Sequence, residues 1–228
     1  MPEQKAIAAS RLAPELREQI ARGLLQPRDR LRLQDLGKRY GVSTSAVREA
    51  LVRLTAEGLV EGEDQRGFRV AEASIDTLVE VTTLRSQFEP YALRLAVERG
   101  DGAWEEGIVA LHHRLTKLEK SADYTVDAWE AVHREFHLGL IRGCGMPMLV
   151  RFCGSLHDLS DRYRRLYMDP PPRRNVAQEH ADIVSAVIAR DADRACEIIT
   201  VHSRRAGEVV LARLRKLAAE QSPGEGQA

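Results

Sequence analysis

The residues from Ile75 to Leu217 follow a helical pattern throughout, and this feature constrains the fold more than any other. Apolar side chains recur every three or four positions, and no stretch alternates as a strand does. The interruptions are short, and short connections favour antiparallel neighbours. The triple proline at 170–172 cannot lie inside a helix. We therefore expect an all-α antiparallel bundle, with helices near 75–99, 103–121, 124–142, 147–167, 174–190 and 192–218.

The first 74 residues are organised differently, because short periodic segments are separated there by Gly and Pro. Helices are predicted at 10–24, 31–41 and 43–58, and short strands at 58–62 and 67–71. This order is typical of a winged helix-turn-helix domain, so the fold class is mainly α with a small β wing. We place the domains at 1–74 and 75–220, and we expect a disordered polar tail at 221–228.

Charge and composition narrow the possible partners and the compartment. The chain of 228 residues carries 34 basic and 34 acidic side chains, and the two domains have net charges of about +2 and −2. Any affinity for DNA must therefore come from a few placed arginines. No apolar run is long enough for a membrane span, and the N-terminus lacks the apolar core of a secretion signal. Three cysteines without a disulfide-framework spacing are typical of the reducing cytosol, so we expect a cytoplasmic protein.

The predicted helix at 43–58 has the chemistry of a DNA-recognition helix. Ser43 is the expected N-cap, and the free backbone N–H groups of the first turn suit a phosphate. Arg48 lies one turn further along and can donate to guanine O6 and N7, whereas Arg53 lies nearer the DNA backbone. At the tip of the wing, Arg66 is placed to enter a minor groove. The alternative is an ordinary amphipathic helix that carries surface arginines.

The histidines are concentrated in the second domain, and counting residues brings four of them together. His133 and His137 are four residues apart and share a helix face. His180 and His202 lie eleven residues before and after the expected turn at Asp191, so an antiparallel hairpin places them level. Converging imidazole nitrogens suit Zn²⁺ or Ni²⁺. The alternative is that these side chains are ordinary core histidines.

The first domain resembles the DNA-binding domain of GntR-family bacterial transcription regulators. The resemblance is carried by VREALVRLTAEGLV (47–60) followed by RGFRV (66–70), within a match of about 60 residues. One departure is that the family usually has Arg where this chain has Thr44, so the operator is expected to differ from those of its relatives. The resemblance implies DNA contacts by Gln34, Ser43, Thr44, Ser45, Arg48, Arg66 and Gly67.

The second domain resembles the ligand-binding FCD domain of the FadR subgroup. The carrying segments are LRSQFEPYALRLA (84–96), HREFHLGLIRGCG (133–145) and EHADIVSAVIARDADRACEIITVH (179–202). Many members bind a divalent metal through one Asp and three His, and the metal helps to hold a small carboxylate effector. The usual Asp is His133 here, so the four-imidazole site carries no ligand charge and is expected to hold a dication less tightly. Alternatively, His133 binds the carboxylate of the effector directly. The resemblance implies His137, His180 and His202 as the three histidine ligands.

Further candidates surround this pocket. His157 is expected level with His133 and close enough to line the pocket. Arg85 stands where the family often places an effector-binding arginine, and its alternative role is a surface salt bridge with Glu89. His112 is expected on a solvated face with its neighbour His113. The arginines at 162, 164 and 165 are also expected in solvent, Tyr163 and Tyr167 in the core, and the cysteines in buried apolar positions.

These features together predict a ligand-responsive transcription regulator. We expect a repressor that binds an inverted repeat as a homodimer and responds to a small carboxylate. A metal-dependent enzyme is the first alternative, but a zinc hydrolase needs Glu directly after the first His, where this chain has Arg134. A helical interaction module without a small ligand is the second alternative.

Overall fold

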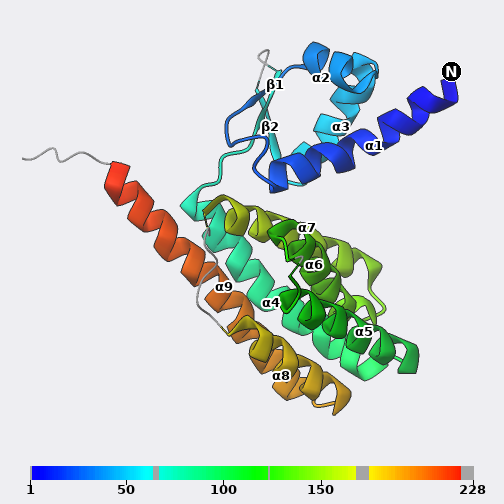
Figure 1. Ribbon diagram of the computed structural model, residues 1–228, viewed down its shortest axis with the longest axis vertical. Coiled ribbons are helices and arrows are strands. Elements are labelled where there is room, and N and C mark those ends of the chain that lie inside the picture. The colour runs from blue at the N-terminus through cyan, green and yellow to red at the C-terminus, as the bar shows by residue number, and fades with distance from the viewer. Residues whose placement is uncertain (1, 64–66, 123, 168–174, 222–228) are drawn as a thin grey trace, which may run out of the picture. The chain divides into compact units, whose positions relative to one another are not determined.

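The structure is a computed structural model, and it describes residues 2–63, 67–122, 124–167 and 175–221 (Figure 1). The backbone divides into two compact units, Met1–Ser74 and Ile75–Ala228. Each unit has its own buried core and is described by itself. Arg66, part of the expected wing tip, and residues 222–228 of the expected tail lie outside the described residues.

The first unit consists of helices and a small antiparallel sheet with the strand order β1-β3-β2. Helix α3 (Thr44–Ala56) packs its apolar face against α1 (Pro2–Ala21), and both contribute fully buried side chains to one core, including Leu16, Ile20, Val47 and Leu51. The elements are α1 (Pro2–Ala21), β1 (Arg30–Leu31), α2 (Leu33–Tyr40), α3 (Thr44–Ala56), β2 (Val60–Glu63) and β3 (Gly67–Val70).

Two capping residues explain the tight turn between α2 and α3. Gly41 closes α2 with a left-handed backbone (φ 65°), a conformation that costs glycine little, and its N–H donates to Gly37 O. Ser43 then opens α3, because its hydroxyl oxygen accepts the N–H of Ala46 at 3.2 Å. Both capping residues can be recognised from the sequence alone, and the predicted positions of α2 and α3 are confirmed within two residues.

Two details of the first unit differ from the sequence prediction. Helix α1 begins at Pro2 rather than near residue 10, because the Ala-rich segment before the apolar stripe has a high helix propensity. Strand β1 was not predicted, because two residues are too few to show alternation. It is defined instead by its partner, since Arg30 pairs with Arg69 and Leu31 with Phe68.

The second unit is an all-α bundle, as predicted, and the fold class is confirmed. Helix boundaries agree with the prediction within about three residues, and N-cap side chains open α5, α6 and α8. The last helix continues through Gln221, one residue into the segment expected as a tail. The helices are α4 (Ile75–Arg99), α5 (Gly102–Glu119), α6 (Val126–Arg142), α7 (Pro147–Tyr167), α8 (Val176–Ile188) and α9 (Ala192–Gln221).

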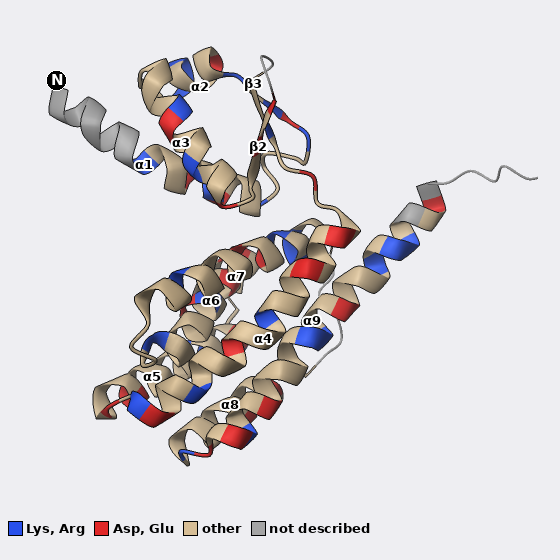
Figure 2. Ribbon diagram, turned by 180° about the vertical axis from the view of Figure 1, so that it is seen from behind, with Lys and Arg blue, Asp and Glu red and all other residues tan. Residues whose placement is uncertain are grey.

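The longest helices of the second unit, α4 and α9, run side by side (Figures 1 and 2). Gly207 on α9 permits this close approach, because a Cβ there would meet the side chain of Thr82 at 2.2 Å. Basic and acidic positions alternate along α9, which agrees with the weak net charge of this domain (Figure 2). The core between the helices includes Leu93, Phe136, Ile183 and Ile199.

None of the described helices combines the length and the apolar content needed to cross a lipid bilayer.

Candidate functional site

The N-terminal end of α3 is an exposed surface suited to nucleic acid. The first backbone N–H groups of a helix have no partner within it, and the helix dipole favours a phosphate there. Arg48 is exposed one turn into the helix, and Arg53 is exposed near its end, where it forms an ion pair with Glu49. The described residues of the predicted DNA-contacting set are all exposed: Gln34, Ser43, Thr44, Ser45, Arg48, Arg53 and Gly67.

Gly67 begins β3 at the inner edge of the wing. Its φ of 98° lies in the left-handed region, and no atom lies within 4 Å of the position of a Cβ. The glycine is therefore required by the backbone conformation rather than by crowding. The neighbouring Arg66 lies outside the described residues, so its role stays a prediction.

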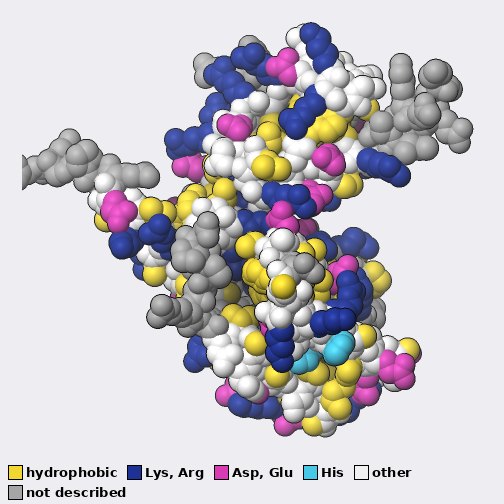
Figure 3. Space-filling model, in the orientation of Figure 1, with side chains coloured by type: hydrophobic (Ala, Val, Ile, Leu, Met, Phe, Trp, Pro, Cys, Tyr) yellow, Lys and Arg dark blue, Asp and Glu magenta, His cyan; other side chains and the backbone are white. Residues whose placement is uncertain are grey.

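The predicted histidines converge inside the second unit. His133 and His137 come from α6, His180 from α8 and His202 from α9. All four are buried, and each offers one ligand atom within 4.8 Å of the others. The rings of His180 and His202 are 5.0 Å apart, so the two side chains equidistant from the turn do lie level. Little histidine reaches the surface in the view of Figure 3.

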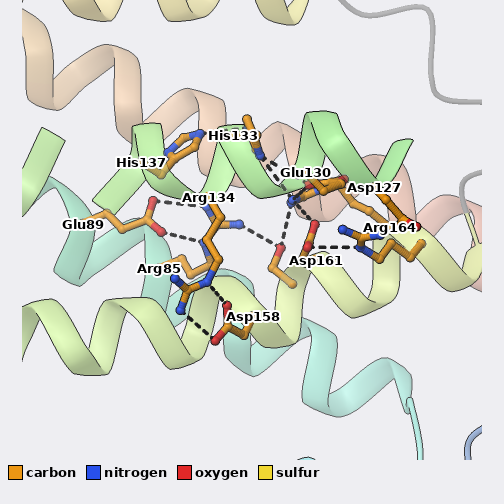
Figure 4. Close-up of polar contacts among 12 residues, drawn as sticks. Arg85, Glu89, Asp127, Glu130, His133, Arg134, His137, Asp158, Asp161 and Arg164 are labelled. Atoms are coloured by element: carbon orange, nitrogen blue, oxygen red, sulfur yellow. Dashed lines mark hydrogen bonds and ion pairs between the residues drawn. The ribbon is translucent and has the colours of Figure 1, made fainter. Parts of the chain in front are cut away.

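The ring nitrogens of the cluster face one another. Nε2 of His133 lies 3.0 Å from Nε2 of His137, and Nδ1 of His133 lies 3.5 Å from Oε2 of Glu130 (Figure 4). Nδ1 of His202 lies 2.8 Å from Oε2 of Glu179. Because a carboxylate only accepts hydrogen bonds, His202 donates from Nδ1 and keeps the lone pair on Nε2.

Burial keeps two of these imidazoles, those of His133 and His137, neutral. Burial, followed by the charge of Arg164, lowers the pKa of His133 well below its ordinary value. Burial, followed by His133, does the same to the pKa of His137. A neutral imidazole is the form that binds a metal, whereas its protonated form cannot. His133 and His137 therefore present their nitrogens in the binding-competent state near neutral pH.

The donor set fits a divalent transition metal. A tetrahedral ion with metal–nitrogen bonds of about 2.1 Å separates its ligand nitrogens by about 3.4 Å. The closest pair, at 3.0 Å, and the outer limit of 4.8 Å bracket this separation, so small side-chain rotations close the shell. Four nitrogen donors without a carboxylate favour Zn²⁺, Ni²⁺ or Cu²⁺ over Mg²⁺ or Ca²⁺.

His157 on α7 is the fifth buried imidazole, and it lies beside the cluster as predicted. Its ring centroid is 5.4 Å from that of His133 and 5.1 Å from that of His137. Neither of its ring nitrogens has a hydrogen-bond partner among the described residues, and burial, followed by Arg85, lowers its pKa well below the ordinary value. Together with His137 it lines a small, mostly apolar cavity with room for about one water molecule.

The position of Arg85 differs from the surface salt bridge that the sequence offered as its alternative role. The predicted pair with Glu89 forms, at 2.7 Å, but it is buried rather than on the surface. The same guanidinium donates to Ser160 on α7 at 2.8 Å, and Glu89 also accepts from Ser203 on α9 at 2.7 Å. Arg85 therefore joins α4 to α7 and, through Glu89, to α9, and its guanidinium is engaged with Glu89 and Ser160 (Figure 4).

The arginine run on α7 was expected in solvent, and this prediction is wrong. Arg162 is 1% exposed, and the side chains of Arg164 and Arg165 are 15% and 11% exposed. Arg164 donates to Glu130 at 2.9 Å and to Asp161 at 2.6 Å. A buried arginine needs such carboxylate partners, since an unpaired buried charge is costly.

The carboxylates around Arg164 titrate as a pair. Burial and the neighbouring Glu130, opposed by Arg164, raise the pKa of Asp161 to about 8. The pKa of Glu130 is lowered, because the pull of its arginine partners outweighs its burial. Neither Glu130 nor Glu179 was singled out from the sequence, although each precedes a candidate histidine by a short interval, Glu130 by three residues and Glu179 by one.

The remaining sequence predictions have mixed outcomes. Tyr163, Cys144 and Cys153 are buried as expected, whereas Cys196 is half-buried and its thiol donates to the carbonyl of Pro90 at 3.1 Å. Tyr167 is partly buried and pairs with Tyr163 at 6.3 Å. His113 is exposed as expected, and His112 is partly buried against the ring of Phe136.

Comparison with known proteins identifies both halves of the chain. Residues 8–70 match the family described as bacterial regulatory proteins, gntR family, and residues 80–205 match the FCD domain. The chain belongs to the GntR family of bacterial transcription regulators. The GntR and FCD resemblance predicted from the sequence is thereby confirmed, and the family is one of DNA-binding regulators rather than of enzymes.

Individual relatives of this GntR-family chain are also regulators. It is 38% identical over 200 residues to an uncharacterized HTH-type transcriptional regulator, BphR, of Paraburkholderia xenovorans, covering 86% of this chain and 82% of the relative. It is 35% identical over 198 residues to the HTH-type transcriptional repressor GlaR of Escherichia coli, covering 82% and 88%. The solved structure of E. coli McbR/YncC has the same fold, with a TM-score of 0.76, 22% identity and coverage of 91% and 98%.

Proposed function

We propose that this GntR-family regulator is a cytoplasmic repressor whose binding to DNA is controlled by a small carboxylate in a metal-containing pocket. In this proposal, domain 1–74 binds an inverted-repeat operator, and domain 75–220 binds the effector and forms the homodimer. The observation that carries the proposal is the cluster of four buried imidazoles in the FCD domain. The free cysteines agree with a reducing compartment.

The DNA contacts follow from the exposed surface of α3. Ser43, Thr44 and Ser45 face a phosphate with the first N–H groups of the helix, and Arg48 reads a guanine in the major groove. Arg53 contacts the DNA backbone in this proposal, as Gln34 does from α2. The wing supplies Arg66 and Gly67 to the adjacent minor groove.

The metal is Zn²⁺ or Ni²⁺, held by His133, His137, His180 and His202. When bound, the ion supplies a Lewis-acid centre to which a carboxylate oxygen can bind. The distance between Nε2 of His133 and Nε2 of His137 supports His133 as a ligand rather than as a direct partner of the effector.

The effector contacts centre on His157. This imidazole lines the cavity beside His137, which has room for about one water molecule, so the cavity must widen before a carboxylate can bind there and accept a hydrogen bond from His157. The predicted contact with Arg85 requires its guanidinium to leave Glu89 and Ser160, which would also loosen α4 from α7. The effector changes DNA binding only if it binds one dimer conformation more tightly than the other.

The homodimer interface is proposed on an apolar surface formed by α4 and α7. Tyr91, Met148 and Phe152 are 51%, 77% and 40% exposed, and the ring of Phe152 packs edge-on against Phe88 at 5.3 Å. Exposed aromatic and methionine side chains of this kind are enriched at interfaces. A two-fold interface would match the two half-sites of an inverted repeat.

The first alternative function, a metal-dependent enzyme, lacks its catalytic base. Arg134 occupies the position after His133, and it donates to Asp158 rather than to the cluster (Figure 4). The second alternative, an interaction module, predicts that neither a metal nor a metabolite binds. Titration of the chain with Zn²⁺ and with a panel of carboxylates distinguishes the three functions.

The decisive experiment compares metal content and operator binding in matched variants. Operator fragments are first selected from random duplex DNA by the full chain. We expect the wild type to retain about one ion per chain, and the His137→Ala/His180→Ala double variant to lose it and to lose any response to the carboxylate panel. The exposed His113→Ala variant is the control. Unchanged metal content in the double variant, or specific DNA binding that no carboxylate alters, would contradict the proposal.

A further inference from the structure

The four-imidazole cluster has a carboxylate directly behind one of its members. His202 is 3% exposed, and its Nδ1 lies 2.8 Å from Oε2 of Glu179 on α8. The hydrogen bond fixes the imidazole with its proton on Nδ1 and its lone pair on Nε2. The ring of His202 lies 5.0 Å from the rings of both His137 and His180, so the fixed ring belongs to the cluster.

Two carboxylates lie beside the ring nitrogens of the cluster, and each of them faces an arginine. Glu130 lies 3.5 Å from Nδ1 of His133, but it forms a buried ion pair with Arg164 at 2.9 Å that balances its charge. Glu179 faces Arg205 at the longer distance of 3.6 Å, and the side chain of Arg205 is 59% exposed. Water around an exposed arginine screens its charge, so this pair is weak.

A shell of four neutral imidazoles leaves both charges of a dication uncompensated in a buried site. Burial makes such a charge expensive unless anionic groups are close. A carboxylate that accepts the Nδ1–H of a ligating imidazole makes that imidazole a stronger ligand. The negative charge that the four imidazoles lack can therefore come from a carboxylate that is hydrogen-bonded to one of them.

We propose that Glu179 is the positioning residue of the metal site, where it fixes the tautomer of His202 and supplies negative charge to the four-imidazole shell. This inference rests on the metal site of the proposed function. It also explains why Glu179 and His180 are adjacent on α8. His180 is itself a ligand, and Glu179 is the hydrogen-bond partner of His202, the ligand on α9. Metal binding would thereby depend on the pairing of these two helices.

The test separates charge from orientation in the full chain. The substitution Glu179→Gln keeps the size of the side chain and an oxygen that can accept the Nδ1–H, but it removes the charge. The apo protein is titrated with Co²⁺, followed by its visible absorption, and Zn²⁺ affinity is measured by competition. We expect Glu179→Gln to weaken both metals by about 10- to 100-fold. The absorption spectrum at saturating Co²⁺ should match that of the wild type, because the same four nitrogens bind.

Two controls make the result specific. Arg205→Gln removes one cation that faces Glu179, so the affinity of this variant for metal should equal or exceed that of the wild type. Urea unfolding of the apo forms should give closely similar curves for Glu179→Gln and the wild type, which excludes a general loss of structure. If Glu179→Gln binds both metals as tightly as the wild type, the role of Glu179 is overturned while the metal site stands. If the wild type binds neither metal, both proposals are overturned.

Discussion

Acidification should destabilise the apo protein through its buried histidines. The pKa values of His133, His137 and His157 are lowered well below the ordinary value, chiefly by burial. In the unfolded chain a histidine takes up a proton as the pH falls through about 6.5. The folded state does not take up these protons until lower pH, so protonation favours the unfolded state and stability falls below pH 6.5.

The loss of unfolding free energy on acidification can be calculated from the pKa of histidine in the unfolded chain alone. For each histidine that stays neutral in the folded state, lowering the pH from about 7.5 to about 5.5 costs about 1.4 kcal/mol of unfolding free energy. Asp161 works in the opposite direction, because burial raises its pKa to about 8 and the folded state then takes up its proton first. A comparison between two variants cancels this opposing contribution.

The assay is urea unfolding of the apo wild type and of His157→Leu, each at the two pH values and in the presence of a chelator. The variant should lose about 1.4 kcal/mol less than the wild type between these pH values, because one buried imidazole has been removed. The matched substitution of the exposed His113→Leu should lose as much as the wild type. If His157→Leu and the wild type show the same pH dependence, the reasoning that the buried ring stays neutral is refuted.

Three further predictions concern DNA binding, the core and the oligomer. Arg48→Ala should weaken binding to the selected operator by about 1–3 kcal/mol while leaving the unfolding curve unchanged, as measured by fluorescence anisotropy and urea titration; equal affinity would remove Arg48 from the interface. Leu51→Ala should destabilise the first unit by about 2–5 kcal/mol in thermal unfolding, because this side chain of α3 is fully buried in the core that α3 shares with α1, and a smaller loss would mean that the core closes around the deletion. Phe152→Glu should convert the dimer to a monomer in sedimentation analysis, and an unchanged mass would place the interface elsewhere.

Local signals explain why the elements of this fold could be predicted from the sequence. The cap at Ser43, the left-handed Gly41 and the uninterrupted helical pattern from Ile75 act within a few residues of the feature that they determine. Strand β1 escaped prediction because its conformation depends on pairing with β3. A two-residue segment carries no pattern of its own.

The candidate metal site was predictable for a geometric reason, and its surroundings were not. Spacing of four on one helix and equal distances from a turn on two others are enough to place imidazoles together. Sequence spacing placed Glu89 beside Arg85, but it did not show that Arg85 and Arg164 would be buried, because their burial also depends on polar partners from other helices. Ser160 on α7, which accepts from Arg85, and Glu130 on α6, which pairs with Arg164, became visible only in three dimensions.

His180 and His202 lie at equal distances from Asp191, so the length of the α8–α9 connection determines whether their imidazoles lie level in the cluster. A single residue inserted between the turn and His202 would rotate that side chain by about 100° and shift it by about 1.5 Å along its helix. The bundle would still bury its apolar residues elsewhere, but Nε2 of His202 would leave the cluster and Nδ1 would leave Glu179. Relatives that keep the metal site should therefore vary in the sequence of this turn while keeping its length, and a change of length would mark regulators that have lost the ion.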